Sequence, residues 1–262
     1  VTVPEIIANG CDMLLFPSPF EADLAHLLRA LRDGRLSEAR VEEAVTRVLG
    51  LKAALGLHRQ TLDERVPPLA QAEATVRCAA HREVEQRVAA ASVTLVKDVQ
   101  ATLPLRLPQH RRIVVVTDPE RGGFIGQPAA ELSLPAELAA RGFEVRAFDP
   151  AQPPTPADTD LVLYLLAQES LLSRAHIFLD WARVQGNWQT AMRRFWHQLP
   201  CVLVSYGQPY YLYDAPRMPC VVNAYSAVPA AQAAVLQRLL GEAPFTGTSP
   251  VDAFCGLPDA RC

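Results

Sequence analysis

The chain has 262 residues, half of them hydrophobic, which is enough for one large domain or for one domain with an appendage. Its formal net charge is −3 and it has no dense run of Lys or Arg, so no nucleic-acid partner is expected. No segment approaches the roughly 20 apolar residues of a membrane-spanning helix, and no membrane partner is expected. The cysteines form no Cys-x-x-Cys pair, which argues against a zinc ribbon or a redox pair.

The N-terminal region predicts an unfinished structural unit. A short helix ends at Gly10, and Asp12–Phe16 is expected to form a short buried strand. Two amphipathic helices follow, one from Phe20 to Leu31 and one that begins at Ser37 and ends at Gly56. Because one strand and two helices cannot enclose a core, we expect this unit to be the end of a larger domain.

The rest of the chain predicts a linker followed by an α/β domain. Residues 58–74 are polar and contain Pro67-Pro68, which is typical of a linker, and a helix is expected over 75–91. The apolar runs expected as strands are 93–96, 112–117, 144–148, 160–166, 201–205 and 220–224, with helices at 134–141, 188–198 and 230–240. This alternation predicts a mostly parallel sheet with helices on both faces.

Several motifs, in order along the chain, resemble glycoside hydrolase family 3. They are Ala8–Leu15, Gly34–Leu57, Ala90–Asp98 with Leu103-Pro104-Leu105, Val204–Tyr210, Asn223–Ser226 and Gly241–Pro250. The first two are similar to the last strand and helix of the (β/α)8 barrel of that family, and the others to its α/β sandwich domain. The resemblance implies a barrel remnant at 1–57, a linker and connecting helix at 58–92, and the sandwich at 93–262.

The resemblance also implies an activity. Pro209–Asp214 and Pro250–Gly256 look more like the bacterial β-N-acetylhexosaminidase branch than the β-glucosidase branch. The parent enzyme is therefore expected to hydrolyse terminal β-linked N-acetylglucosamine or glucose residues, with a carbohydrate as its partner and with no metal or organic cofactor. Val1–Gly10 lack the pattern of a secretory leader, which slightly favours the cytoplasm, while secretion stays open because the chain begins in mid-domain.

The nucleophile of the family is missing from this sequence. A retaining glycosidase needs a carboxylate nucleophile and a proton donor about 5 Å apart. In family 3 the nucleophile is an Asp in a Ser-Asp context on an earlier barrel strand, and no Ser-Asp dipeptide occurs here. The Lys-His pair of the hexosaminidase branch is absent as well. We therefore expect the chain by itself not to hydrolyse glycosides.

Glu169 is the candidate proton donor. In the β-glucosidase branch this role belongs to a Glu on a loop of the second domain, and Glu169 follows the strand expected at 160–166. Loops that follow parallel strands face the site side of an α/β domain. The competing interpretation is a solvated loop carboxylate, because the flanking Ser170-Leu171 does not match the branch's pattern. Arg174, in the same loop, is a candidate for substrate binding.

Aromatic and turn residues supply the remaining candidates. Trp181, Trp188 and Trp196 lie close together, and aromatic faces are platforms for sugar rings. The helical spacing of Trp188 and Trp196 predicts core packing, so Trp181 is expected to be the most exposed of the three and to bind substrate. Ser18 lies where the catalytic face of a complete barrel would be and is a candidate contact, with a plain turn as the alternative.

Two other functions compete with this interpretation. Gly122–Gly126 after a strand mimics a dinucleotide-binding turn, but Arg121 occupies the first glycine position, and Pro128 and Pro135 separate the glycines from the helix. The stronger alternative is a non-catalytic carbohydrate-binding or interaction module. Its incomplete barrel unit would expose apolar surface able to pair with a second copy of the chain.

Overall fold

The computed structural model describes residues 2–16, 19–118, 131–168 and 178–262. The chain divides into two compact units, Val1–Val76 and Arg77–Cys262. The first unit has a small hydrophobic core. The second unit has a large hydrophobic core on each face of a β-sheet.

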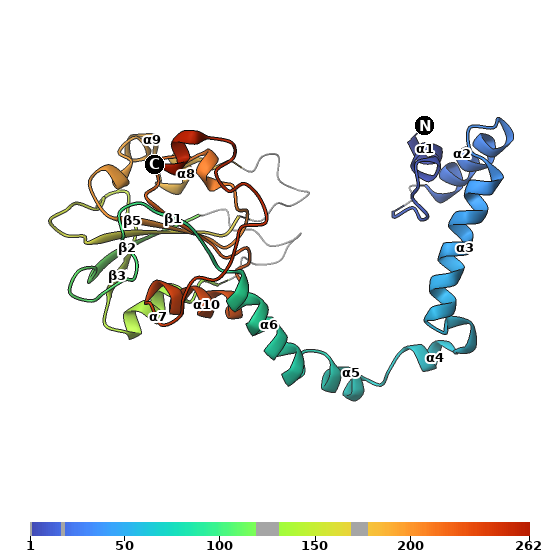
Figure 1. Ribbon diagram of the computed structural model, residues 1–262, viewed down its shortest axis with the longest axis horizontal. Coiled ribbons are helices and arrows are strands. Elements are labelled where there is room, and N and C mark those ends of the chain that lie inside the picture. Colours follow the sequence, from blue (N-terminus) through green and yellow to red (C-terminus); the bar gives the residue numbers. More distant parts are fainter. Residues whose placement is uncertain (1, 17–18, 119–130, 169–177) are drawn as a thin grey trace. The chain divides into compact units, whose positions relative to one another are not determined.

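The described residues of the first unit form helices and irregular segments. Its elements are α1 (Thr2–Ala8), α2 (Phe20–Arg32), α3 (Glu38–Ala54), η1 (Leu57–Arg59), α4 (Leu62–Arg65) and α5 (Leu69–Thr75) (Figure 1). Helix α3 begins as predicted, because the Ser37 Oγ accepts a hydrogen bond from the backbone N–H of Arg40 at 3.2 Å. Ile7, Ala30 and Leu36 form the buried centre of this unit.

The prediction of a strand at Asp12–Phe16 is wrong. The segment is irregular, and the side chains of Leu15 and Phe16 are 80% and 92% exposed. A strand must pair its backbone N–H and C=O groups with a neighbouring strand. The described residues of the first unit contain no strand that could serve as that neighbour.

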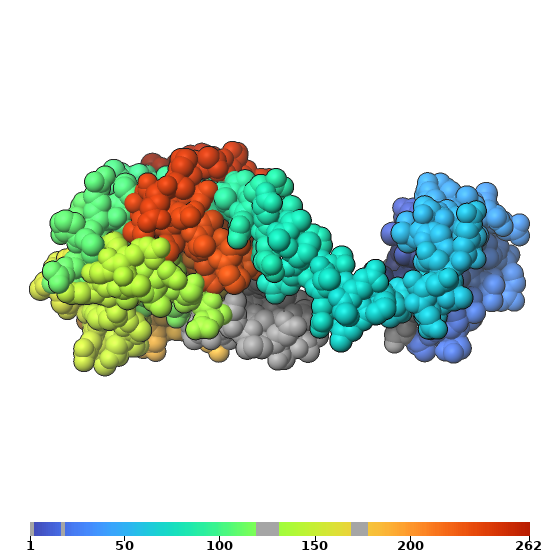
Figure 2. All heavy atoms as spheres, turned by 90° about the horizontal axis from the view of Figure 1, so that it is seen from below, coloured from blue at the N-terminus to red at the C-terminus, as the bar shows by residue number. Residues whose placement is uncertain are grey.

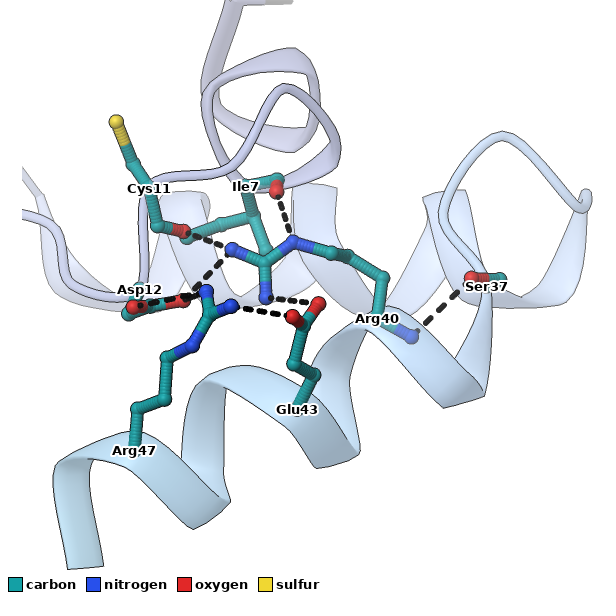
Figure 3. Close-up of polar contacts among 7 residues, drawn as sticks. All are labelled: Ile7, Cys11, Asp12, Ser37, Arg40, Glu43 and Arg47. Atoms are coloured by element: carbon teal, nitrogen blue, oxygen red, sulfur yellow. Dashed lines mark hydrogen bonds and ion pairs between the residues drawn. The ribbon is translucent and has the colours of Figure 1, made fainter. Parts of the chain in front are cut away.

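Arg40 ties the irregular segment to α3 (Figure 3). Its guanidinium donates hydrogen bonds to the backbone carbonyl of Ile7 at 2.9 Å, to that of Cys11 at 3.1 Å and to the Asp12 carboxylate at 2.7 Å. Arg47 donates to the same carboxylate at 3.3 Å. The hydrogen bond from Arg40 is the main reason why the pKa of Asp12 is lowered. All these groups face one another within the first unit, so the network is a structural clamp.

The expected linker contains short helices. Thr61 and Glu64 form a capping box at the start of α4, in which the Thr61 N–H donates to the Glu64 carboxylate at 2.7 Å and the Thr61 Oγ1 accepts from the Glu64 N–H at 3.3 Å. Neither α4 nor α5 contains a buried residue. Helix α6 (Ala79–Ser92) begins later than predicted, after Arg77 adopts a left-handed conformation with φ of 56°.

The second unit is built on a six-stranded sheet with the order β1-β6-β5-β4-β2-β3. The strands are β1 (Thr94–Asp98), β2 (Arg112–Thr117), β3 (Glu144–Ala147), β4 (Leu161–Leu166), β5 (Cys201–Ser205) and β6 (Cys220–Asn223). All neighbours pair in parallel except β1 and β6, which are antiparallel. The prediction of a mostly parallel sheet flanked by helices is confirmed.

Helices cover both faces of this sheet. Helices α6, α7 (Leu134–Ala140) and α10 (Pro229–Leu239) lie on one face, the face from which Figure 2 is viewed. On the other face lie α8 (Trp181–Val184), α9 (Trp188–Ala191), η2 (Phe195–His197), η3 (Tyr211–Tyr213) and η4 (Pro258–Arg261). The helix predicted over 188–198 is interrupted: α9 ends at Ala191, and Arg194, in a left-handed conformation with φ of 47°, separates it from η2.

Strand β4 shows why the layers hold together. Every residue of the strand is buried, and successive side chains point to opposite faces. Leu161, Leu163 and Leu165 pack in the cluster beneath α6, α7 and α10, while Val162, Tyr164 and Leu166 pack in the cluster on the other face. A strand buried on both faces has a continuous apolar sequence, which is why this one was recognisable from the sequence.

The Arg112–Asp160 pair at the start of β2 and β4 generates a prediction about stability. The Asp160 carboxylate accepts a hydrogen bond from the Arg112 backbone N–H at 2.8 Å and pairs with the guanidinium at 2.6 Å, which lowers the pKa of Asp160. Replacing Asp160 with Asn is expected to lower the free energy of unfolding of the second unit by about 1 kcal/mol at pH 7. Urea unfolding followed by tryptophan fluorescence measures this free energy of unfolding, because all three tryptophans lie in the second unit.

The pH dependence of this effect has a definite sign. Since the folded state holds the pKa of Asp160 below the usual value of 3.8, the stabilisation is present above about pH 4 and is lost as the pH falls through the lower, folded pKa. The stability gap between wild type and Asp160→Asn should therefore narrow at acid pH. Asp259→Asn is the matched control, because that carboxylate is 80% exposed and pairs with Arg217 only at 3.7 Å. An equal loss in both variants would contradict the prediction.

The Arg40 clamp generates a second prediction. Arg40→Met removes the donors for two backbone carbonyls and for the Asp12 carboxylate, so the segment before α2 should detach from α3. Hydrogen exchange of the full chain should show faster exchange in peptides covering residues 2–12, and unchanged exchange in β4. Arg29→Met, which removes an exposed arginine of α2, is the control. Unchanged exchange over residues 2–12 would show that the clamp is dispensable.

Candidate functional site

The carboxyl ends of β2, β4 and β5 lie together at one edge of the sheet, because these strands are parallel neighbours. Binding sites of open α/β sheets arise at this edge. The residues that follow the strands include the polar side chains of Asp118, Gln168 and Gln208, which are only 1%, 6% and 8% exposed. Buried polar side chains at strand ends mark this edge as the candidate site.

The segments after β4 and β5 are held against each other by their backbones. The N–H of Tyr206 donates to the carbonyl of Leu166 at 2.7 Å, and the N–H of Gln208 donates to that of Gln168 at 3.2 Å. Between these bonds lies Gly207, where an added Cβ would come within 2.0 Å of the Gln168 oxygen. Only glycine permits this approach, so the backbone that leads into position 169 is constrained by β5.

Two buried hydroxyl groups reinforce this contact. The Ser205 Oγ donates to the Gln208 carbonyl at 2.6 Å, which closes the turn after β5. The Tyr211 hydroxyl accepts a hydrogen bond from the Gln168 N–H at 3.3 Å. Since Ser205 and Tyr211 are almost completely buried, these bonds are shielded from water and hold both segments in place.

An aromatic depression adjoins this edge. It has a volume of 410 Å³ and is lined by Phe178, Gln208, Tyr210, Tyr213, Asp214 and Cys255. The three aromatic side chains are unusually open for their size, with exposed fractions of 51% for Phe178, 38% for Tyr210 and 65% for Tyr213. The depression therefore offers apolar ring surface to solvent beside the carboxyl ends of β4 and β5.

Asp214 is the carboxylate of this depression. One oxygen of its carboxylate accepts a hydrogen bond from the Leu179 N–H at 2.9 Å, and its backbone carbonyl accepts one from the Trp181 indole at 3.2 Å. Partial burial raises the pKa of Asp214, although the hydrogen bond from Leu179 opposes that shift. The carboxylate is thus fixed in position at the wall of an apolar surface.

Three of the predicted site residues, Ser18, Glu169 and Arg174, lie outside the described residues, as does the glycine-rich segment Gly122–Gly126. The fourth, Trp181, is the N-terminal residue of α8 and is half-buried. The described part of the chain therefore tests only the surroundings of Trp181.

The predicted exposures of the tryptophans are wrong for two of the three. Trp188 is the exposed one, at 67%, whereas Trp196 is 8% exposed as expected for a core residue. Trp181 packs edge-on against Tyr164 with ring centroids 5.9 Å apart, contacts Trp196 at 5.4 Å and is covered by the Arg194 guanidinium at 5.0 Å. Because the helix breaks before Trp196, the spacing of a continuous helix does not apply to these residues.

The aromatic depression was missed as a site by the sequence analysis. The sequence identifies Pro209–Asp214 only as a family motif, although the two tyrosines at 210 and 213, a few residues after a buried strand, are a visible signal of a site. Another lining residue, Cys255, is distant in sequence and could not be assigned to the same place.

The described residues hold no group of three His, Cys, Asp or Glu side chains arranged to bind a metal ion. Within the same ranges, no helix combines the length and apolar character needed to cross a membrane.

Comparison with known proteins identifies relatives over nearly the whole chain. No protein-family model matches it. A β-N-acetylglucosaminidase/β-glucosidase of Cellulomonas fimi is 36% identical over 271 aligned residues, which cover 99% of this chain and 47% of that protein. The chain therefore spans about half the length of this curated relative.

Solved structures match this chain over nearly its whole length, and the matches cover about half of their own chains. A β-glucoside phosphorylase, BglX, is 31% identical with a TM-score of 0.78, and the match covers 99% of this chain and 46% of BglX. A family 3 β-N-acetylglucosaminidase from Paenibacillus sp. str. FPU-7 shares the fold, with a TM-score of 0.62, 19% identity, and coverage of 94% of this chain and 46% of that chain. With the sheet order and the sequence identity taken together, this chain belongs to glycoside hydrolase family 3 and is a C-terminal portion of such a protein.

Proposed function

We propose that this chain is the C-terminal part of a hydrolase that removes terminal β-linked N-acetylglucosamine or glucose residues, and that it has no turnover by itself. The observation that supports the activity is the 36% identity, over 99% of the chain, to the Cellulomonas β-N-acetylglucosaminidase/β-glucosidase. The name of that relative covers both sugars, and the motifs at Pro209–Asp214 and Pro250–Gly256 favour the N-acetylglucosaminidase branch.

In this proposal the parts of the chain have different tasks. Residues 1–57 are the end of the (β/α)8 barrel, 58–92 connect it to the second domain, and 93–262 form the α/β sandwich. The absence of any Ser-Asp dipeptide supports the inference that the nucleophile is supplied by barrel residues outside this sequence. A single carboxylate cannot perform retaining glycoside hydrolysis, which needs a nucleophile and a proton donor together.

The loop after β4 is proposed to complete the catalytic pair. Glu169 would donate the proton to the leaving group, while Arg174 and Ser18 would contact the sugar. The contact between Gly207 and Gln168 supports this role, because it constrains the backbone immediately before Glu169. Trp181 would contribute through its indole N–H, which donates to the backbone carbonyl of Asp214 and helps to position the neighbouring aromatic depression.

Phosphorolysis is the second candidate reaction. It is favoured by the 31% identity to BglX, which is named a β-glucoside phosphorylase. Hydrolysis transfers the glycosyl group to water and yields the free sugar, whereas phosphorolysis transfers it to inorganic phosphate and yields a glycosyl phosphate. The two reactions share the donor site and differ only in the acceptor.

The proposed function predicts turnover only when the barrel is complete. The purified chain should release no p-nitrophenol from p-nitrophenyl N-acetyl-β-glucosaminide or β-glucoside. The same chain extended by the barrel residues of its natural protein should be active. Chromatography of the products with and without inorganic phosphate identifies the acceptor, since glycosyl phosphate appears only in phosphorolysis. Turnover by the unextended chain, after removal of contaminants, would refute the proposal.

Glu169→Gln in the extended enzyme tests the proton donor. Loss of a general acid is expected to lower kcat about 10²- to 10⁴-fold on a substrate with a poor leaving group. The loss should be much smaller for a dinitrophenyl glycoside, whose leaving group needs no proton. Glu137→Gln, which changes an exposed carboxylate of α7 paired with Arg141, is the control and should keep full activity. Equal losses on both substrates would assign Glu169 a different role.

A further inference from the structure

We infer that the aromatic depression lined by Phe178, Tyr210 and Tyr213 binds one pyranose ring, whose hydroxyl groups donate hydrogen bonds to the Asp214 carboxylate. The identity of the ligand class rests in part on the proposed function. The site itself is argued from described residues and does not include the catalytic candidates. Its test is a binding measurement that needs no turnover.

The first argument is the exposure of the aromatic rings. Tyr213 is 65% exposed and Phe178 is 51% exposed, yet both line the same 410 Å³ depression together with Tyr210. Aromatic side chains that converge on one concave surface are typical of small-molecule sites. A pyranose has an apolar face of C–H groups and a rim of hydroxyls, so it can stack on such rings and still reach a polar acceptor.

The second argument is that the rings are held on a rigid turn. Between Tyr210 and Tyr213, the side chains of Tyr211 and Leu212 are 1% and 2% exposed and anchor η3 in the core. The N–H of Tyr213 also donates to the Tyr210 carbonyl at 2.9 Å, which closes the turn. A preformed site loses little conformational entropy when a ligand binds.

The third argument concerns the charged acceptor of the depression, the Asp214 carboxylate. The Asp214 carboxylate is oriented by the Leu179 N–H at 2.9 Å, and its backbone is oriented by the Trp181 indole at 3.2 Å. A carboxylate has several lone pairs, so the bond to Leu179 leaves capacity for hydroxyl donors. Hydrogen bonds to a carboxylate are stronger than those between neutral groups, which suits recognition of a neutral sugar.

The composition of the wall discriminates between ligand classes. Among the described residues that line the depression there is no Arg, Lys or His, and Asp214 carries the only formal charge. A phosphate, a nucleotide or another anion would meet a carboxylate without a compensating cation. A neutral glycoside is therefore the class that the wall fits.

Saturation-transfer difference NMR on the chain as it stands tests this inference. Methyl N-acetyl-β-glucosaminide and methyl β-glucoside should show saturation transfer to their ring protons, and sorbitol, an acyclic polyol, should show none. Tyr213→Ala should abolish the transfer, and Asp214→Asn should weaken binding about tenfold, as expected for loss of one charge-assisted hydrogen bond. Trp188→Ala is the matched control, because it removes an exposed aromatic ring on α9, outside the depression.

The outcomes separate this inference from the proposed function. No transfer to either glycoside, or an equal loss in Tyr213→Ala and Trp188→Ala, would overturn the site. Circular dichroism of each variant shows whether it is folded, so that misfolding is excluded as the cause of lost binding. Tyr213→Phe keeps the aromatic ring and should retain saturation transfer. Specific binding by the chain together with an inactive extended enzyme would uphold the site and refute the proposed reaction. An active extended enzyme, with no glycoside binding by the chain itself, would support the proposed function and refute the site in the depression.

Discussion

The parallel pairing of β4 with both β2 and β5 is the constraint on which the second unit depends. Every residue of β4 is buried, and its alternating side chains build the cores on both faces of the sheet. Parallel pairing also brings the carboxyl ends of three strands to one edge, so that Asp118, Gln168 and Gln208 lie in the same region although long stretches of sequence separate them. The same pairing that stabilises the fold therefore assembles the candidate site.

The contact between Gly207 and Gln168 fixes the backbone beyond the ends of β4 and β5. Because the Gln168 carbonyl lies where a Cβ would be, the turn after β5 and the segment after β4 act as one body. The buried anchor residues of η3 then present Tyr210 and Tyr213 beside that body. Precise positioning of a proton donor or of a sugar requires such support, since small displacements of a catalytic group reduce the rate strongly.

The first unit has a different kind of order. Its buried centre is small, and the Arg40 clamp holds the segment before α2 by hydrogen bonds to backbone carbonyls and to Asp12. Its helices nevertheless leave large apolar side chains open, among them Leu49 and Leu55, which are 57% and 60% exposed. Large exposed apolar side chains are typical of an interaction surface, and the chain spans about half the length of the relatives that it matches.

The sequence by itself determined the class of the second domain and the position of every strand in its sheet to within two residues, because strands buried on both faces have apolar runs that need no knowledge of their neighbours. It also located the Ser37 helix cap, which is a local interaction. Tertiary structure decided the rest. Asp12–Phe16 is apolar enough for a strand, but the described residues of the first unit contain no strand to pair with it. Helix α9 ends at Ala191 and the left-handed Arg194 separates it from η2, although the spacing alone would continue the helix. The aromatic depression joins Tyr210 to Cys255, and the exposure of Trp181 depends on Tyr164 and Arg194. Such contacts are set by how distant segments pack, which the pattern of one segment does not encode.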